Sequence, residues 1–422
     1  MTSPTTVPLQ RNRQFQLLWT GAAASMLGSQ LTRVATPLLL LAITGSPGKA
    51  GLVSAVGIVG MLVLQMPAGV LVDRSDRRRS LSITQAAQVI NSAALMIMLL
   101  SGRAGLWNFI MFSIIDGGCQ AFLSPARNVA IRNVVPSAQL RQAYTQEEAR
   151  SHGTRLLGPV LGGALYAANS LLPFVLDTLS FLIAWVCTVI GRVPRQPPVT
   201  AGGDQEVAPS GQRRTHMVAE AVEAARWIVR QRGMREMILV VTAMNLLGGA
   251  FSIPVIVHVR ELGGSSTITG LVLTGSGIGG LVGAVLAGQI TGRIPAGRLA
   301  AIVPAVFGIC MAAAALPLAD WWPIIPIVIF SLIIPSLNIT LATITAQLVP
   351  PEMLGRLGSL LGFTAYGLQP LGPLLGGVLS QMIGGGPTLL CVGIGLLLTA
   401  GAAASSRSLR TFRSDASENL AA

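Results

Sequence analysis

Residues 51–79 read GLVSAVGIVGMLVLQMPAGVLVDRSDRRR. The first 22 of them, residues 51–72, carry no charge, whereas the last seven include four arginines and two aspartates. As a helix that rises about 1.5 Å per residue, the apolar part is long enough to cross the roughly 30 Å hydrocarbon core of a bilayer. An apolar run of this length that ends in a short basic segment is typical of a transmembrane helix followed by a cytoplasmic turn.

The composition of the whole chain agrees with this interpretation. Of the 422 residues, 51% are apolar and 11% are charged, and the mean hydropathy is +0.65. Soluble proteins carry charge on about a quarter of their residues, so this chain must face lipid over much of its surface. The net charge of +13 comes from arginine, since Lys49 is the only lysine. We attribute the excess to cytoplasmic loops and expect no nucleic-acid partner.

Apolar runs of about 20 residues, separated by Gly, Pro and charged residues, predict twelve transmembrane helices. The fifth run is the least distinct, because its first turns are amphipathic. The fold class that follows is an all-α integral membrane protein embedded in a lipid bilayer. The twelve runs are residues 17–43, 51–72, 81–101, 106–127, 146–169, 172–191, 236–259, 267–291, 298–317, 322–347, 357–384 and 387–405.

Basic residues in the short loops predict that both chain termini lie in the cytoplasm of a multi-pass plasma- or inner-membrane protein. The loops on the opposite side contain only Lys49, Arg103 and Arg260. The predicted cytoplasmic side carries Arg74, Arg77, Arg78, Arg79, Arg132, Arg141, Arg293, Arg356, Arg407, Arg410 and Arg413.

This topology divides the chain into five parts. Residues 192–235 form a polar cytoplasmic linker, and within it residues 218–229 place apolar side chains at helical spacing, which predicts an amphipathic helix at the membrane surface. The other parts are a cytoplasmic N-terminus (1–16), an N-terminal six-helix bundle (17–191), a C-terminal six-helix bundle (236–405) and a cytoplasmic tail (406–422).

The two predicted bundles are related in sequence. Residues 45–74 and 264–293, offset by 219, share 11 of 30 positions, and residues 153–165 and 367–379, offset by 214, share eight of 13. Both alignments pair helices that run in the same direction across the membrane. Two parallel six-helix repeats joined by a long cytoplasmic linker are one established transporter architecture.

The loop after the second predicted helix has the pattern Gly-x-x-x-Asp-Arg-x-x-Arg-Arg, formed by Gly69, Asp73, Arg74, Arg77 and Arg78. In this pattern the chain resembles the major facilitator superfamily, whose signature loop has the same form. The resemblance implies a cytoplasmic gate in which the aspartate lies against the N-terminus of the eleventh helix, where a carboxylate is favoured by about 0.3–2 kcal/mol. The alternative is a solvated basic turn that only sets the topology.

A second motif, in the fifth predicted helix, consists of Gly158, Pro159, Gly162 and Gly163. It resembles the antiporter motif of the same superfamily, which implies export. Small residues also let helices approach closely, so plain helix packing is the alternative. The preceding Gly153 lies one residue from the position that a strict motif requires.

Further segments resemble one branch of the superfamily, the enterobactin-exporter and macrolide-efflux type. They include the start of the first helix (residues 12–15), Ser124-Pro125-Ala126, and Asp177 ahead of Ser180-Phe181. The branch often has Asp after the glycine of the first helix, but here Ser29 follows Gly28. The resemblance implies a secondary active transporter that exports a drug, antibiotic or siderophore by alternating access, coupled to protons.

Charged side chains inside a span cost about 2.5–3.5 kcal/mol to insert, so each is a candidate for coupling or substrate binding. Counting along the helices places Asp116 and Arg155 at similar depth, which predicts that they pair, either as a proton-sensitive link or as a static tie. Arg33 then remains available to an anionic group of the substrate. Asp177, five residues into its run, is expected near the membrane surface and Glu147 in solvent. The second bundle offers the neutral candidates Asn245, Asn338, Tyr366 and Gln369.

We expect a small-molecule substrate and protons as partners, and no cofactor, metal or nucleotide. Gly275–Gly280 matches a dinucleotide-binding pattern, but it lies inside a predicted span with no strand before it. An enzyme is disfavoured, since the three histidines are scattered and no catalytic cluster is evident. An importer or uniporter of the same fold, and a non-transporting membrane scaffold or receptor, remain as alternatives.

Overall fold

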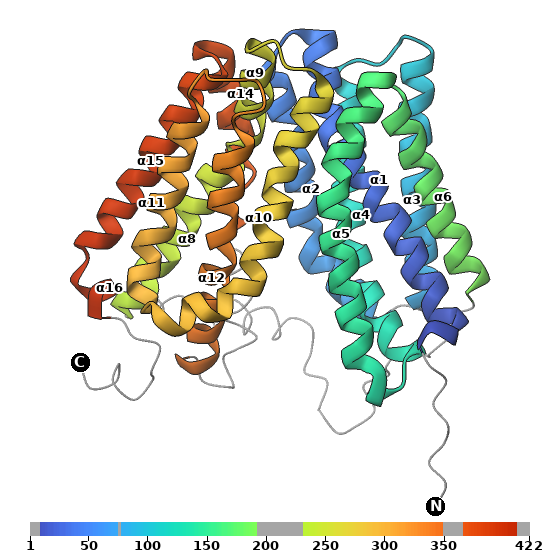
Figure 1. Ribbon diagram of the computed structural model, residues 1–422. Coiled ribbons are helices and arrows are strands. Elements are labelled where there is room, and N and C mark those ends of the chain that lie inside the picture. Colours follow the sequence, from blue (N-terminus) through green and yellow to red (C-terminus); the bar gives the residue numbers. More distant parts are fainter. Residues whose placement is uncertain (1–8, 75–76, 192–230, 349–365, 412–422) are drawn as a thin grey trace, which may run out of the picture. The chain divides into compact units, whose positions relative to one another are not determined.

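A computed structural model of the chain describes residues 9–74, 77–191, 231–348 and 366–411, and all regular structure in these ranges is helical (Figure 1). Lipid tails offer no hydrogen-bond partners to the backbone. A helix is favoured in a bilayer because it pairs its backbone N–H and C=O groups internally. After a 3-10 turn at Leu9–Arg11, the first group comprises α1 (Arg13–Thr44), α2 (Pro47–Arg74), α3 (Arg77–Leu100), α4 (Leu106–Val134), α5 (Leu140–Ala168) and α6 (Leu172–Ile190).

The second group of helices begins at Arg232, inside the linker predicted at 192–235. It contains three short helices, α9, α14 and α16, as well as long ones. The elements are α8 (Arg232–Gly249), α9 (Ser252–Glu261), α10 (Ser266–Arg293), α11 (Ala296–Ala314), α12 (Ile324–Leu348), α14 (Leu371–Ile383), α15 (Gly385–Ser405) and α16 (Arg407–Thr411).

Ten of the described helices or helix pairs are long and apolar enough to cross a membrane, and they coincide with ten of the twelve predicted runs. The fifth run corresponds to α5, a helix of 29 residues that also carries two glutamates and three arginines. Of the eleventh run, the structure describes only α14 and the residues just before it, because residues 349–365 lie outside the described ranges. The predicted amphipathic helix at 218–229 lies outside them too.

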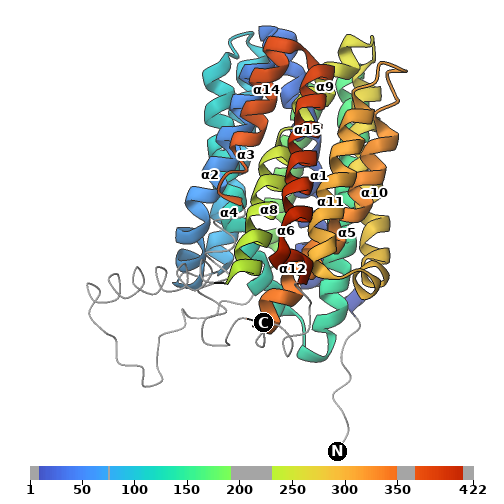
Figure 2. The ribbon, with the colours of Figure 1, turned by 90° about the vertical axis from the view of Figure 1, so that its left-hand side faces the viewer.

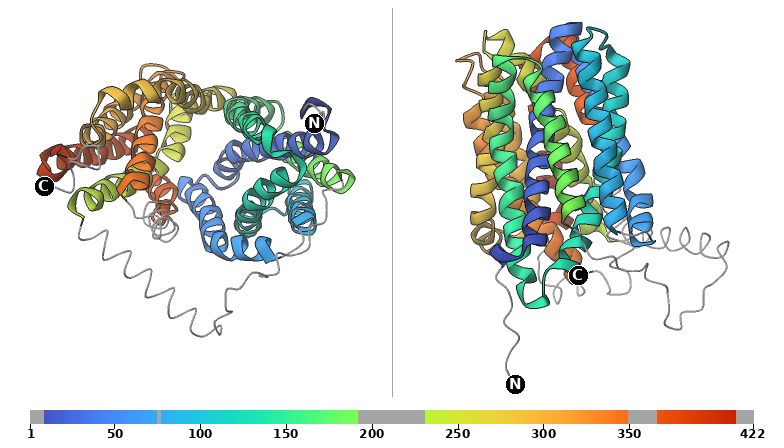
Figure 3. Two further views of the ribbon diagram at one scale, coloured as in Figure 1. Left: turned by 90° about the horizontal axis from the view of Figure 1, so that it is seen from below. Right: turned by 90° about the vertical axis from the view of Figure 1, so that its right-hand side faces the viewer.

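The chain forms two compact units. Unit 1 contains residues 1–204 and 265–274, and unit 2 contains residues 205–264 and 275–422. In unit 1, α1 packs along α6 and α5, α2 along α4, and α3 along α4 and α6; Figure 3 shows these helices end-on. In unit 2, α11 packs against α12 and α15, and α15 also contacts α8, α9 and α14 (Figure 2).

The contacts inside the two units repeat with the sequence offsets found above. Gly60 of α2 packs on the backbone of Ile114 in unit 1, and Gly279 of α10 packs on the backbone of Val328 in unit 2. These pairs are related by 279 − 60 = 219 and 328 − 114 = 214. The same two offsets relate a second set of contacts: Gly162 with Leu31 in unit 1, and Gly376 with Ala250 in unit 2. The duplication seen in the sequence therefore extends to the packing.

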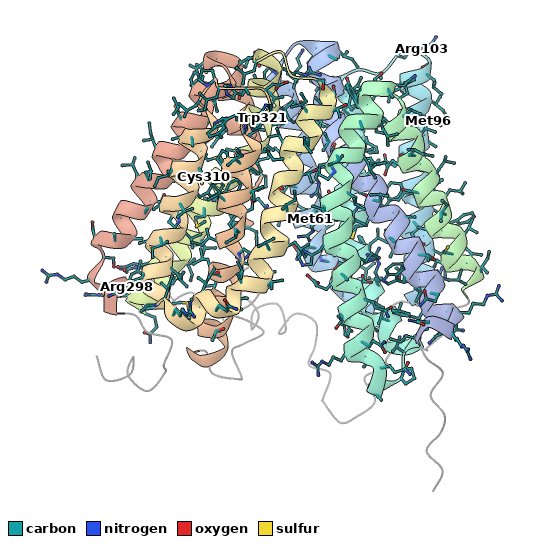
Figure 4. The ribbon with its side chains drawn as sticks, in the orientation of Figure 1. Met61, Met96, Arg103, Arg298, Cys310 and Trp321 are labelled. Carbon is teal, nitrogen blue, oxygen red and sulfur yellow. The ribbon has the colours of Figure 1, made fainter. Side chains whose placement is uncertain are left out.

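A hydrophobic cluster closes the end of unit 1 at which α1 begins. Asn12 caps α1 by accepting the backbone N–H of Phe15 at 3.1 Å, and its Nδ2 donates to the carbonyl of Val134 at 2.9 Å. Arg103, on the turn between α3 and α4, lies at the other end of the unit (Figure 4). The buried members of the cluster are Leu9, Phe15, Leu18, Val72, Leu81, Leu123, Ala126, Ala130, Ile131, Val134, Val135 and Ala143.

Candidate functional site

Asp116 lies on α4 with an amide donor from a neighbouring helix. The Nε2 of Gln88, on α3, donates to Oδ1 of Asp116 at 3.2 Å. Gln88 is buried and Asp116 is half-buried. A carboxylate in a membrane-spanning helix needs such compensation because neither lipid nor apolar side chains offer a donor.

Arg33 of α1, and not Arg155, is the cation that interacts electrostatically with Asp116. Among the described residues no ion pair joins Asp116 to either arginine. The charge of Arg33 acts on Asp116, whereas Arg155, whose side chain is exposed on α5, acts on Arg33. The reason is the register between α1 and α4. Gln120 of α4 donates to the hydroxyl of Ser29 of α1 at 3.3 Å. Arg33 lies one turn after Ser29, and Asp116 lies one turn before Gln120. Because the two helices are antiparallel, both steps lead in the same direction in space. The predicted pairing of Asp116 with Arg155 was therefore wrong.

Asp177 is buried among the helices of unit 1. The residue is 1% exposed, and its Oδ2 accepts a hydrogen bond from the hydroxyl of Ser92 on α3 at 3.0 Å. Its other oxygen, Oδ1, lies 2.8 Å from the place where a Cβ on Gly28 would be. Gly28 is 15 residues from the first and 16 from the last residue of α1. Asp177 therefore lies against the middle of α1, and its depth in the membrane stays a prediction.

The motif in α5 is a packing surface for α1. A side chain at Gly158 would overlap the Cβ of Gln30, and one at Gly162 would come within 3.0 Å of the carbonyl oxygen of Leu31. Pro159 lies inside the helix between them. Gly163 packs on Gly270 at the start of α10, which belongs to the same unit. By contrast, Gly153 has no neighbour within contact distance among the described residues.

The gate motif is described only in part. Gly69 lies within the last turns of α2, which ends at Arg74, and α3 starts at Arg77. The side chains of Asp73, Arg74, Arg77 and Arg78 lie outside the described structure, as does the start of the eleventh run that the resemblance implies as the partner of Asp73. The gate therefore stays a prediction.

The polar candidates of unit 2 have no carboxylate among them. Asn245 donates from Nδ2 to the carbonyl of Val241 in its own helix at 3.0 Å. Asn338 and Tyr366 are exposed, and Gln369, half-buried, lies in the turn before α14. In the described part of unit 2 no aspartate or glutamate is buried, and the buried carboxylate among the described residues is Asp177 of unit 1.

Comparison with known proteins identifies the family. The model of the family described as transmembrane secretion effector matches residues 3–421. The chain belongs to this family of the major facilitator superfamily. The match covers both groups of helices, so the family accounts for the whole chain and confirms the resemblance drawn from the two motifs.

Two similar proteins are named as bacterial efflux pumps. The chain is 26% identical over 386 residues to the multidrug efflux pump Tap of Mycolicibacterium fortuitum, covering 88% of this chain and 90% of the relative. It is 24% identical over 411 residues to macrolide efflux protein A of Streptococcus pyogenes, covering 90% of this chain and 94% of the relative.

Solved transporter structures share the fold. A bacterial homolog of the human lysosomal transporter Spinster, in an inward-facing and occupied conformation, matches with a TM-score of 0.72 at 14% identity, covering 96% of this chain and 98% of that one. A bacterial homologue of the iron transporter ferroportin matches with a TM-score of 0.69 at 16% identity, covering 94% and 99%. These likenesses confirm the major facilitator fold.

Sequence reasoning missed the polar face of α3. Gln85, Gln88 and Ser92 are all buried, and their spacing of three and then four residues puts them on one face of the helix. This face supplies the donors to both Asp116 and Asp177. The signal was present in the sequence as three polar residues at helical spacing within an apolar run.

A second charged cluster was also missed, where α4 and α5 meet. Glu147 accepts from Arg150 and lies 3.9 Å from the guanidinium of Arg127, and all three side chains are mostly buried. The expectation that Glu147 is solvated was wrong, because α5 turns it towards α4. Its neighbour Glu148 is exposed and pairs with His152 at 3.1 Å. The described residues contain no group of three His, Cys, Asp or Glu side chains that could hold a metal ion.

Proposed function

We propose that this protein exports small organic molecules by alternating access, driven by protons that return to the cytoplasm. It would lie in the plasma or inner membrane with both termini in the cytoplasm, as the distribution of arginine in its loops suggests. Its two six-helix domains, residues 17–191 and 236–405, are joined by the linker at 192–235. The observation that carries the proposal is the half-buried Asp116, which interacts with Gln88 and Arg33 inside unit 1.

Proton coupling follows from the charge balance at Asp116. When Asp116 is ionised, it interacts electrostatically with Arg33 on α1. When Asp116 binds a proton, Arg33 loses this interaction, and the guanidinium of this exposed residue can bind an anionic or polar group of the substrate. Proton and substrate then compete for the same pair of side chains, which is what an exchange mechanism requires.

The direction of transport and the class of substrate rest on the relatives. The multidrug and macrolide efflux pumps align over most of this chain, so a drug or an antibiotic is the substrate class that we propose. A siderophore, implied by the resemblance to enterobactin exporters, is the other organic cargo to test. Gly158, Pro159, Gly162 and Gly163 support export because they match the antiporter motif.

The loop between α2 and α3 is proposed as the cytoplasmic gate. Asp73 would lie against the start of the eleventh helix while Gly69, Arg74, Arg77 and Arg78 complete the motif. A carboxylate at a helix N-terminus is stabilised by about 0.3–2 kcal/mol, which holds a gate closed and still lets it open.

An importer or uniporter of the same fold is the second candidate. It is favoured by the polar candidates of unit 2, Asn245, Asn338, Tyr366 and Gln369, because none of them is a carboxylate. A carrier that needs no proton could work with such neutral groups alone.

A screen of drug susceptibility and metabolite retention tests the direction of transport. We compare cells that lack the gene with cells that overexpress it, over macrolides, other antibiotics and siderophores. Export predicts that deletion increases susceptibility to at least one compound and its retention in the cell, and that overexpression does the reverse. Lower retention after deletion would instead indicate an importer, and no change for any compound would favour a non-transporting scaffold.

A further inference from the structure

Asp177 is a buried carboxyl that the proposed exchange at Asp116 does not use. Its Oδ2 accepts from Ser92, and its Oδ1 has no hydrogen-bond partner among the described residues. The absence of a side chain at Gly28 makes room for Oδ1, because a Cβ at this position would come within 2.8 Å of the oxygen. α1 and α6 thus pack around a carboxyl group that accepts a hydrogen bond from one side-chain hydroxyl among the described residues.

One hydroxyl is too little for a buried carboxylate. An ionised carboxyl group can accept about four hydrogen bonds and has no donor of its own. Burying it inside a protein without these hydrogen bonds costs free energy. Adding one proton changes its charge from −1 to 0 and gives it a donor of its own. The site at Asp177 therefore has the geometry of a place that binds a proton.

The groups around Asp177 connect it to Asp116. Ser92 and Gln88, the donors to the two carboxyls, are four residues apart on α3 and so on the same face of that helix. Oε1 of Gln88 is buried and has no hydrogen-bond partner among the described residues, so the amide has an acceptor to offer. The two carboxylates also interact electrostatically.

The charged groups near this pair are few. From α4 it is Asp116, from α1 it is Arg33, which interacts with Asp116, and from α5 it is Arg155, which interacts with Arg33. The hydrogen bonds of Asp177 are to neutral groups, because Ser92 donates to its Oδ2 and Ser180 to its backbone carbonyl. The charge that acts on Asp177 itself is that of Asp116, and two carboxylates that interact in this way are not both ionised without cost.

We propose that Asp177 is a second proton-binding group of unit 1, linked to Asp116 through Ser92 and Gln88. A proton taken from water adds to Oδ1 of Asp177, and its release restores the carboxylate. This inference rests on the proposed proton-driven function for its role in transport, but proton binding at Asp177 can be measured without any substrate.

Infrared difference spectroscopy of the purified protein provides that measurement. Spectra recorded between about pH 5 and about pH 9, which spans the range of perturbed carboxyls, show the C=O band of each protonated carboxyl group. We expect a band in the wild-type protein that is lost in Asp177→Asn and kept in Glu148→Gln, the control for an exposed carboxylate. A band that persists unchanged in Asp177→Asn would overturn the proposal.

Ser92→Ala tests the same point in a protein that keeps its carboxyl. If Asp177 binds a proton, loss of the Ser92 donor moves the pH at which the band appears; a carboxyl with a purely structural role leaves the spectrum as it was. This arm decides the question even if Asp177→Asn does not fold. Transport of the screened compounds by Ser92→Ala is measured separately, so a failure of the export function is distinguishable from a failure at Asp177.

Discussion

Replacing Asp116 by Asn is expected to abolish transport driven by a pH gradient while the protein still folds and inserts. Asn keeps the shape of the side chain and can still bind Gln88, but it neither binds a proton nor interacts as an anion with Arg33. In vesicles with an imposed pH gradient, accumulation of an exported compound should fall to the level of protein-free vesicles.

Asp320→Asn is the matched control, because this aspartate lies between α11 and α12, outside the helices long enough to cross the membrane. It should transport like the wild-type protein. Binding of the compound to Asp116→Asn should also persist, since Arg33 remains. Full proton-driven transport by Asp116→Asn would remove Asp116 from the mechanism.

Alanine at two glycines of α5 should change stability in opposite directions. Gly153 has open space beside it, so Ala there gains about 1 kcal/mol of helix propensity. At Gly158 the added methyl overlaps Gln30 of α1, and overpacking of this kind costs about 1–3 kcal/mol. Thermal unfolding of the two variants in detergent measures the difference.

The larger Gly158→Leu substitution should separate α1 from α5 and leave little folded protein, whereas Gly153→Leu should be tolerated. Because both positions lie in the same helix within five residues of each other, a general effect on insertion would affect both. Equal stability of Gly158→Ala and Gly153→Ala would show that the motif is not a packing surface.

The fold could be predicted from the sequence because each helix that crosses a membrane needs an apolar run of about 20 residues. Ten predicted runs correspond to long apolar helices, and the offsets of 219 and 214 reappear in the packing of Gly60 and Gly279. α5 was the weakest prediction for a physical reason: it carries charged residues, of which Glu147 pairs with Arg150 in the same helix and lies 3.9 Å from Arg127 of α4.

The candidate site was only partly accessible. The sequence indicated that Asp116, Arg33 and Arg155 lie inside or near the membrane, but depth counted along each helix does not fix the direction in which a side chain points. Rotation of α5 exposes Arg155, while the register of α1 on α4 brings Arg33 to Asp116. The packing of Asp177 against the middle of α1 was not accessible either, because its place five residues into α6 does not say which part of a neighbouring helix it meets.

Transport in proteoliposomes tests the account most directly. Purified protein is reconstituted, the lumen is made acidic relative to the outside, and the uptake of a labelled compound identified in the susceptibility screen is followed. Proton-driven export predicts accumulation in the lumen above the outside concentration, reversed when a proton ionophore collapses the gradient. Uptake that only equalises the two concentrations, with or without the pH gradient, would contradict it.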